Sequence, residues 1–271
     1  MHEKISVNSV CLNGGNASWP EVFSYWRALH PRRVSFIGPQ TEDSTAVRDL
    51  IKADGYALET IFHPFLVGKH LESKESTWLD ERVKLTRAIK FAAGVGARSV
   101  YIPTGGHGPL AWEEAAEAFS AAIAPCVAEA KAAGVILMIE NTGQLYANIH
   151  IAHSLRDALT LAEMAGVGIC IDLFACWSEA GLRETIKKAI PRCDLIQVAD
   201  YVYGDRSLPC RAVPGDGAIP LKRILDWALS AGFKGAFDLE LLGPRIEKEG
   251  FVAATHRAAD NVGEILHSLG A

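Results

Sequence analysis

The 271-residue sequence lacks the features that mark several large protein classes. No apolar run approaches the roughly 20 residues that a membrane-spanning helix needs. The first residues run into a strand-like segment without the pattern of a secretory signal peptide. The net charge is −5, so the composition shows no basic stripe of the kind that binds a nucleic-acid backbone. We therefore expect a cytoplasmic protein that binds neither membranes nor nucleic acids.

Cysteine and glycine motifs of the familiar kinds are also missing. None of the six cysteines is separated from the next by the two residues that are typical of zinc and redox sites. In a cytosolic α/β chain they are expected to be reduced thiols, several of them buried. No Gly-x-Gly-x-x-Gly follows the first predicted strand, which argues against a nucleotide-binding open sheet.

What the sequence does have is a regular alternation of strand and helix. With 49% hydrophobic and 22% charged residues, the chain can bury a large core. Strand-like segments are predicted at 5–10, 33–37, 56–62, 99–102, 135–141, 167–172, 194–199 and 236–240. Helices are predicted at 19–29, 41–53, 77–95, 112–133, 155–165, 179–190, 221–231 and 252–266. Eight βα units of this kind predict an α/β fold, a single (β/α)8 TIM barrel forming one domain over residues 1–271. An open doubly wound sheet is the alternative.

Polar residues stand where the last four predicted strands end. Residues 135–139 form an unbroken apolar run, typical of a strand buried on both faces, and Glu140 follows it. Asp172, Gln197 and Glu240 occupy similar places on the next three strands. Because parallel barrels place their chemistry at the carboxyl ends of the strands, we expect all four side chains to share one mouth. Three carboxylates and an amide oxygen suit Mg²⁺ or Mn²⁺ better than Zn²⁺. A single acid at a strand end is often only a helix cap, so this prediction depends on the whole set.

Five further residues are candidates for substrate binding. His63 and His107 follow strand ends, where they can donate to substrate hydroxyls, or simply pack within a loop. Asp200 can orient Gln197 or contact bound water. Arg211 lies in the long loop after the seventh strand, a common place for anion binding in barrels. Trp177 can form an apolar wall against a sugar ring, and packing against a neighbouring loop is the alternative.

Five short segments, in their order and spacing, carry a family resemblance. They are Gly-Val-Ile-Leu-Met-Ile-Glu-Asn at 134–141, Ile-Asp at 171–172, Gln-Val-Ala-Asp at 197–200, Pro-Gly-Asp-Gly-Ala-Ile-Pro at 214–220 and Asp-Leu-Glu at 238–240. With them the chain resembles the xylose isomerase-like sugar isomerase/epimerase superfamily. Its barrels also include inosose dehydratases, ketose 3-epimerases and endonuclease IV. The resemblance covers nearly the whole chain.

The resemblance implies a metal site with one altered ligand. In that family a Glu, an Asp, a His and a Glu on the last four strands hold one divalent ion. Glu140, Asp172 and Glu240 match three of these positions, and Gln197 stands where the family has its histidine. Ala175 occupies a second position that is often histidine. The implied cofactor is one divalent metal, Mn²⁺ or Mg²⁺ first, with Co²⁺ or Zn²⁺ as alternatives.

The resemblance also implies a reaction. Glu140 and Glu240 would be the catalytic pair: one removes a proton beside a carbonyl group and the other returns one, while the metal stabilises the resulting anion. This indicates an isomerase or epimerase acting on a small sugar, cyclitol or related keto-substrate. A dehydratase or lyase on the same scaffold is the runner-up, and a metal-poor barrel that only binds ligands is a third reading. The scarcity of histidines at the strand ends and the acidic net charge disfavour a nuclease. A homodimer is left open.

Overall fold

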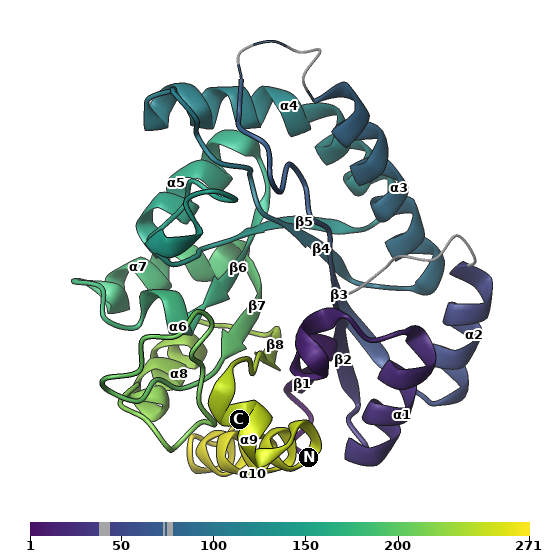
Figure 1. Ribbon diagram of the computed structural model, residues 1–271, viewed down its shortest axis with the longest axis vertical. Coiled ribbons are helices and arrows are strands. Elements are labelled where there is room, and N and C mark those ends of the chain that lie inside the picture. The colour runs from purple at the N-terminus through teal and green to yellow at the C-terminus, as the bar shows by residue number, and fades with distance from the viewer. Residues whose placement is uncertain (38–43, 73, 75–77) are drawn as a thin grey trace.

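Eight parallel strands close into a barrel in the computed structural model, which describes residues 1–37, 44–72, 74 and 78–271. The strands are β1 (Ile5–Asn8), β2 (Arg33–Phe36), β3 (Ala57–Phe62), β4 (Ser99–Ile102), β5 (Ile136–Glu140), β6 (Gly168–Asp172), β7 (Cys193–Val198) and β8 (Ala236–Leu239). Each pairs with its neighbour in sequence, and β8 pairs with β1 through Ile5↔Phe237 and Val7↔Leu239. The predicted (β/α)8 barrel is confirmed (Figure 1).

Helices surround this barrel in a ring (Figure 1). They are α1 (Trp19–Leu29), α2 (Ser44–Ala53), α3 (Leu79–Val95), α4 (Trp112–Ala133), α5 (Leu155–Ala165), α6 (Leu173–Cys176), α7 (Leu182–Ala189), α8 (Leu221–Ser230), α9 (Pro244–Glu249) and α10 (Phe251–Ser268). Hydrogen bonds from capping residues fix where several of these helices begin. The Ser154 hydroxyl accepts the Asp157 N–H at 3.0 Å at the start of α5, and the Ser18 N–H donates to Glu21 at 2.7 Å before α1. In the described part of the chain, no helix is long and apolar enough to cross a membrane.

The structure departs from the predicted elements at a few boundaries. The first strand stops at Asn8, because the Asn8 side chain accepts the N–H of Val10 at 3.0 Å and turns the chain into a 3₁₀ helix, η1 (Ser9–Cys11). The helix predicted at 179–190 begins only at Leu182, since Gly181 adopts a left-handed conformation with φ of 72°. Helices α6 and α9 were not predicted. The predicted starts of two helices, at residues 41 and 77, lie outside the described residues.

The barrel interior has an apolar floor beneath the strand ends. Its members come from adjacent strands and are buried together: Tyr101, Met138, Cys170, Leu195 and Ala236. Because side chains alternate along a strand, the residue two places later points into the same interior. That places Glu140, Asp172, Gln197 and Asp238 above the floor. The floor therefore closes the barrel from below, and the polar residues form the next layer toward the carboxyl ends.

Candidate active site

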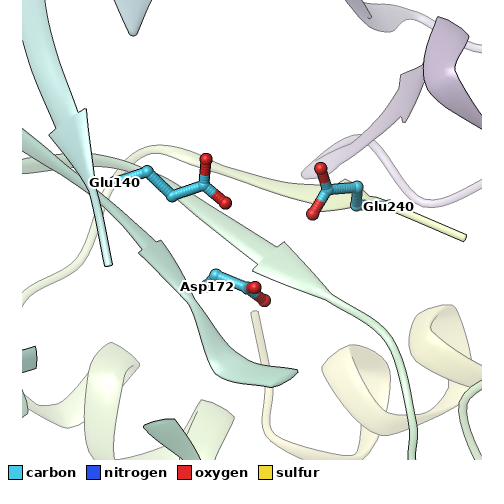
Figure 2. A group of neighbouring side chains, drawn as sticks. All are labelled: Glu140, Asp172 and Glu240. Carbon is cyan, nitrogen blue, oxygen red and sulfur yellow. The ribbon is translucent and has the colours of Figure 1, made fainter. Parts of the chain in front are cut away.

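Three carboxylates converge above the apolar floor (Figure 2). Glu140 ends β5, Asp172 ends β6, and Glu240 directly follows β8. Their side chains point toward one another, and one carboxylate oxygen from each lies within 4.8 Å of the others. Asp172 and Glu240 are buried, whereas Glu140 is half-buried. The structure thus brings together the three acids that the strand-end pattern selects.

Gln197 lies beside this group on β7. It pairs with Asp172 across β6 and β7 and with Asp238 across β7 and β8, so these side chains share the inner face of the barrel. Gln197 is fully buried, and neither its amide oxygen nor its amide nitrogen has a hydrogen-bond partner among the described residues. An unpaired buried amide costs about 1–3 kcal/mol, so such groups normally have a partner. The amide is thus free to ligate an ion held by the carboxylates.

Arg211 brings one positive charge into the same layer from the loop between β7 and α8. Its Nη1 and Nη2 atoms donate to the two carboxylate oxygens of Asp172 at 3.0 and 2.8 Å. Nη2 also lies 2.8 Å from Oε2 of Glu240. The guanidinium is buried and sits over the ring of Phe174, 4.9 Å from its centroid. It therefore fixes the orientation of Asp172 and links it to Glu240.

One arginine does not neutralise this layer. Burial raises the pKa of Glu240 to about 7; Arg211 opposes the shift, and Asp172 and Asp238 add to it. Burial, together with the Glu240 and Asp172 carboxylates, holds the pKa of Glu140 well above its usual range. Burial also raises the pKa of Asp238 to about 6, although hydrogen bonds from Ser6, Ser35 and Asn8 lower it. Crowded acids in a dry interior favour either a proton or a further cation.

The two predicted histidines do not reach this layer. His63 is buried, its Nε2 atom has no hydrogen-bond partner among the described residues, and burial lowers its pKa to about 4. The charged groups that act on His63 are Glu81 and Lys84 of α3 rather than the three carboxylates. His107 is exposed in the loop after β4. Contact of either residue with a substrate stays a prediction.

Asp200 is buried and organises the loop that carries Arg211. Its carboxylate accepts backbone N–H groups from Tyr201, Gly215, Gly217 and Ile219 at 2.8–3.0 Å. A Cβ at Gly217 would lie 2.4 Å from both the Asp200 carboxylate and the Tyr201 carbonyl, so only glycine fits there. In this structure Asp200 acts on the loop backbone, and within the described part of the chain no hydrogen bond joins it to the Gln197 amide.

Trp177 belongs to an aromatic cluster formed by Phe174, Trp177, Tyr201 and Tyr203. The Trp177 ring lies 6.3 Å from the rings of both Tyr201 and Tyr203, and Tyr201 lies 6.0 Å from Phe174. Phe174 in turn supports Arg211. The cluster joins the loops after β6 and β7 and leaves Tyr203 74% exposed. It is continuous with the carboxylate layer through the arginine.

Tyr146 is a neighbour of the site that the sequence reasoning missed. It ends the 3₁₀ helix η4 (Gln144–Tyr146) in the loop after β5 and is half-buried. Burial raises its pKa, and the charged groups that act on it are Arg211 and the three carboxylates. The tyrosine thus lies within the electrostatic field of the site. No spacing in the sequence singles it out, since its position depends on how the loop folds back.

Comparison with known proteins identifies the family of this barrel. The family described as xylose isomerase-like TIM barrel matches residues 23–262, which is most of the chain. The chain belongs to this family. No curated protein sequence matches it significantly.

Solved structures show the same xylose isomerase-like barrel. A protein from Sinorhizobium meliloti 1021 is 22% identical, with a TM-score of 0.80 and 98% of both chains covered. The IolI protein with a bound zinc atom is 14% identical, with a TM-score of 0.82 and coverage of 98% of this chain and 99% of that one. An L-ribulose 3-epimerase is 18% identical, with a TM-score of 0.81 and coverage of 100% and 96%. At these identities the likeness establishes the fold, which epimerases share.

Two positions of this barrel, Gln197 and Ala175, differ from the histidines expected from the family resemblance. Gln197 occupies the predicted position on β7, and its amide oxygen has no competing hydrogen bond among the described residues. Ala175 lies in α6. The three remaining predicted ligands are all acids gathered at one point. Four oxygen donors from four consecutive strands are a donor set that suits a hard divalent ion.

Proposed function

We propose that this protein is a divalent-metal-dependent isomerase or epimerase that moves a proton next to a carbonyl group of a sugar, cyclitol or related keto-substrate. The observation that carries the proposal is the layer formed by Glu140, Asp172 and Glu240 with the unpaired amide of Gln197. We also propose that residues 1–271 act as one domain, since β1 and β8 are partners in the same barrel.

The chemistry of these residues fits a divalent metal, which would share Asp172 and Glu240 with the Arg211 guanidinium. Glu140, Asp172, Gln197 and Glu240 would hold it, with Mn²⁺ or Mg²⁺ favoured by the all-oxygen donor set and Co²⁺ or Zn²⁺ as alternatives. When bound, the ion would supply Lewis-acid stabilisation of the negative charge that develops on the carbonyl oxygen. The zinc named in the IolI structure and the epimerase named above support this proposal at the level of the shared fold.

The chain's own acids supply the proton transfer. Glu140 accepts no hydrogen bond from the described residues and is half-buried, so its carboxylate is available to take a proton from a substrate carbon. Glu240 lies across the site and would return a proton to the substrate. Without an ion, burial raises its pKa to about 7. Arg211, fixed by Asp172, presents its guanidinium beside Glu240 and can orient a substrate oxygen. Trp177 would bound the substrate on the side of the aromatic cluster.

Metal content is the first test. We expect the purified protein to hold close to one equivalent of manganese, magnesium or cobalt by elemental analysis. Glu240→Gln keeps the shape but removes a charged ligand, so metal affinity should fall by a factor on the order of 100. Glu113→Gln, at an exposed position of α4, is the matched control and should retain the metal.

Proton exchange tests the reaction itself. The metal-loaded protein should incorporate solvent deuterium at the carbon beside the carbonyl of a turned-over ketose, and Glu140→Gln should abolish this exchange. Release of water from the substrate, giving an unsaturated product, would instead assign the runner-up dehydratase or lyase activity. Absence of metal in the wild-type protein after soaking with each ion would contradict the proposal and leave a binding role.

A further inference from the structure

The backbone of Asp172 is held by a side chain from the neighbouring strand. Asn141 follows Glu140 directly and is fully buried. Its Oδ1 atom accepts the Asp172 N–H at 3.0 Å, and its Nδ2 group donates to the Asp172 carbonyl at 2.9 Å. One amide thus satisfies both backbone groups of a single residue.

This contact continues the β-sheet beyond its last backbone pair. The β5–β6 ladder runs through Met138↔Gly168 and Ile139↔Ile169 to Glu140↔Cys170. Asn141 then bonds both groups of Asp172 that a neighbouring strand would bond. Because Asn141 is covalently next to Glu140, the contact fixes the ends of β5 and β6 relative to each other. It therefore sets the separation of the Glu140 and Asp172 side chains.

A second side chain does the same at the end of β8. The Cys11 thiol, in η1 after β1, donates to the Leu239 carbonyl at 3.2 Å and accepts the Leu241 N–H at 3.2 Å. These two backbone groups flank Glu240 on either side. Burial raises the pKa of Cys11 to about 12, so the thiol keeps the proton that it donates. Cys11 is fully buried and contacts the backbone rather than the carboxylate.

We propose that Asn141 and Cys11 are positioning residues that set the separation of the three carboxylates by bonding the backbone at Asp172 and around Glu240. The inference rests on the proposed function of that layer as a metal site. Neither residue belongs to the proposed ligand set, so each acts through the strand end that it holds. Such support matters because metal sites tolerate only small errors in ligand position.

The first measurement is hydrogen exchange of single amides in the metal-free protein. In Asn141→Leu, which keeps the size but removes both hydrogen bonds, the Asp172 amide should exchange at least about tenfold faster than in the wild type. Asn141→Asp keeps the acceptor and should retain most of the protection. In Cys11→Ala the Leu241 amide should be the one that accelerates, and Cys11→Ser, which keeps donor and acceptor, should restore its protection.

The second measurement is Mn²⁺ affinity by calorimetry on folded protein. Asn141→Leu and Cys11→Ala should weaken binding by about 10- to 100-fold, whereas Cys11→Ser stays within about threefold of the wild type. Cys126→Ala removes a similarly buried thiol from α4, which bonds the Arg82 carbonyl rather than a strand end, and is the control for loss of a buried thiol outside the site. It should lower the melting temperature without changing the affinity.

Two results would overturn the inference. One is unchanged protection of the Asp172 and Leu241 amides in Asn141→Leu and Cys11→Ala, and the other is Mn²⁺ binding in both variants as tight as in the wild type. If the wild-type protein itself binds no Mn²⁺, the metal proposal fails, and the positioning role is then decided by amide exchange together with the carboxylate separations in crystal structures of the same variants.

Discussion

Gln197 is the proposed ligand that we expect to decide the choice of metal. An amide oxygen suits Mg²⁺ and Mn²⁺, whereas an imidazole favours Zn²⁺ and other transition metals. Gln197→His should therefore raise the affinity for Zn²⁺ relative to Mn²⁺ by about tenfold or more, and Gln197→Ala should weaken both. Competition titrations against a chelator measure the two affinities. If both variants kept the wild-type affinities, Gln197 would not be a ligand.

Individual residues differ in how far the sequence predicts their place. Glu140, Asp172 and Glu240 are predictable because a strand end in a parallel barrel has a known direction and a known neighbour. Arg211 was selected only by its loop, and its bonds to Asp172 depend on how 201–219 folds back. Asn141 ends the segment 134–141 that carries the family resemblance, yet its contact with the backbone of another strand is non-local and no spacing encodes it.

At the scale of elements, the loop between β7 and α8 is the part that delivers Arg211. Asp200 holds it through four backbone N–H groups, and hydrogen bonds to a charged acceptor contribute about 1.5–3 kcal/mol each. Asp200→Ala should therefore loosen residues 201–219 and displace Arg211. We expect about 100-fold lower turnover and a smaller change in Mn²⁺ affinity, because the proposed ligands lie on the strands and only Asp172 and Glu240 also bond Arg211.

Gly217→Ala is a second variant that should disturb the same loop, residues 201–219, as Asp200→Ala. Its added Cβ meets the Asp200 carboxylate and the Tyr201 carbonyl at 2.4 Å, so it should disturb the loop without removing any charge. Hydrogen exchange over 201–219 reports the loosening directly. Loss of metal in either variant, with the loop still protected, would contradict this division between loop and strands.

The elements themselves were mostly predictable, and the exceptions share a cause. Hydrophobic runs and helix caps located all eight strands and α1, α4 and α5 within a residue or two. The errors lie where a local side chain or glycine redirects the backbone. Asn8 ends β1 early, and Gly181 delays α7. Asp172 accepts the Phe174 N–H at 2.9 Å and starts α6 within one residue of the strand.

At the scale of the whole molecule, closure of the barrel forms the site. It also brings buried carboxylates close enough to repel one another. Strand ends separated by 100 residues in the chain, Glu140 and Glu240, meet because β8 returns to β1. The same closure removes their carboxylates from water. The fold therefore holds acids that the unfolded chain would ionise freely. We expect its stability to depend on pH and, through the proposed metal site, on divalent ions.

The sign of that dependence follows from Glu240. Its pKa rises from an ordinary 4.5 to about 7 in the folded protein. Between these values the folded state keeps a proton that the unfolded state has lost, so the Glu240 contribution to the free energy of unfolding falls as pH rises, by an amount on the order of 3 kcal/mol in total. His63, with its lowered pKa of about 4, acts in the opposite direction. The slope of the free energy of unfolding against pH is therefore the sum of these opposing contributions.

Comparison with Glu240→Gln removes contributions common to both proteins and leaves that of Glu240 together with its effect on Glu140. Without metal, the variant should match the wild type in melting temperature near pH 5 and exceed it increasingly toward pH 8, where the wild type carries the buried charge. Saturating Mn²⁺ should reverse the order at pH 8, since the ion binds the ionised carboxylate and stabilises only the wild type appreciably. Scanning calorimetry at several pH values with and without Mn²⁺ measures both effects. A difference between the two proteins that stayed constant from pH 5 to 8 would mean that Glu240 is ionised throughout, and that Arg211 alone compensates its charge.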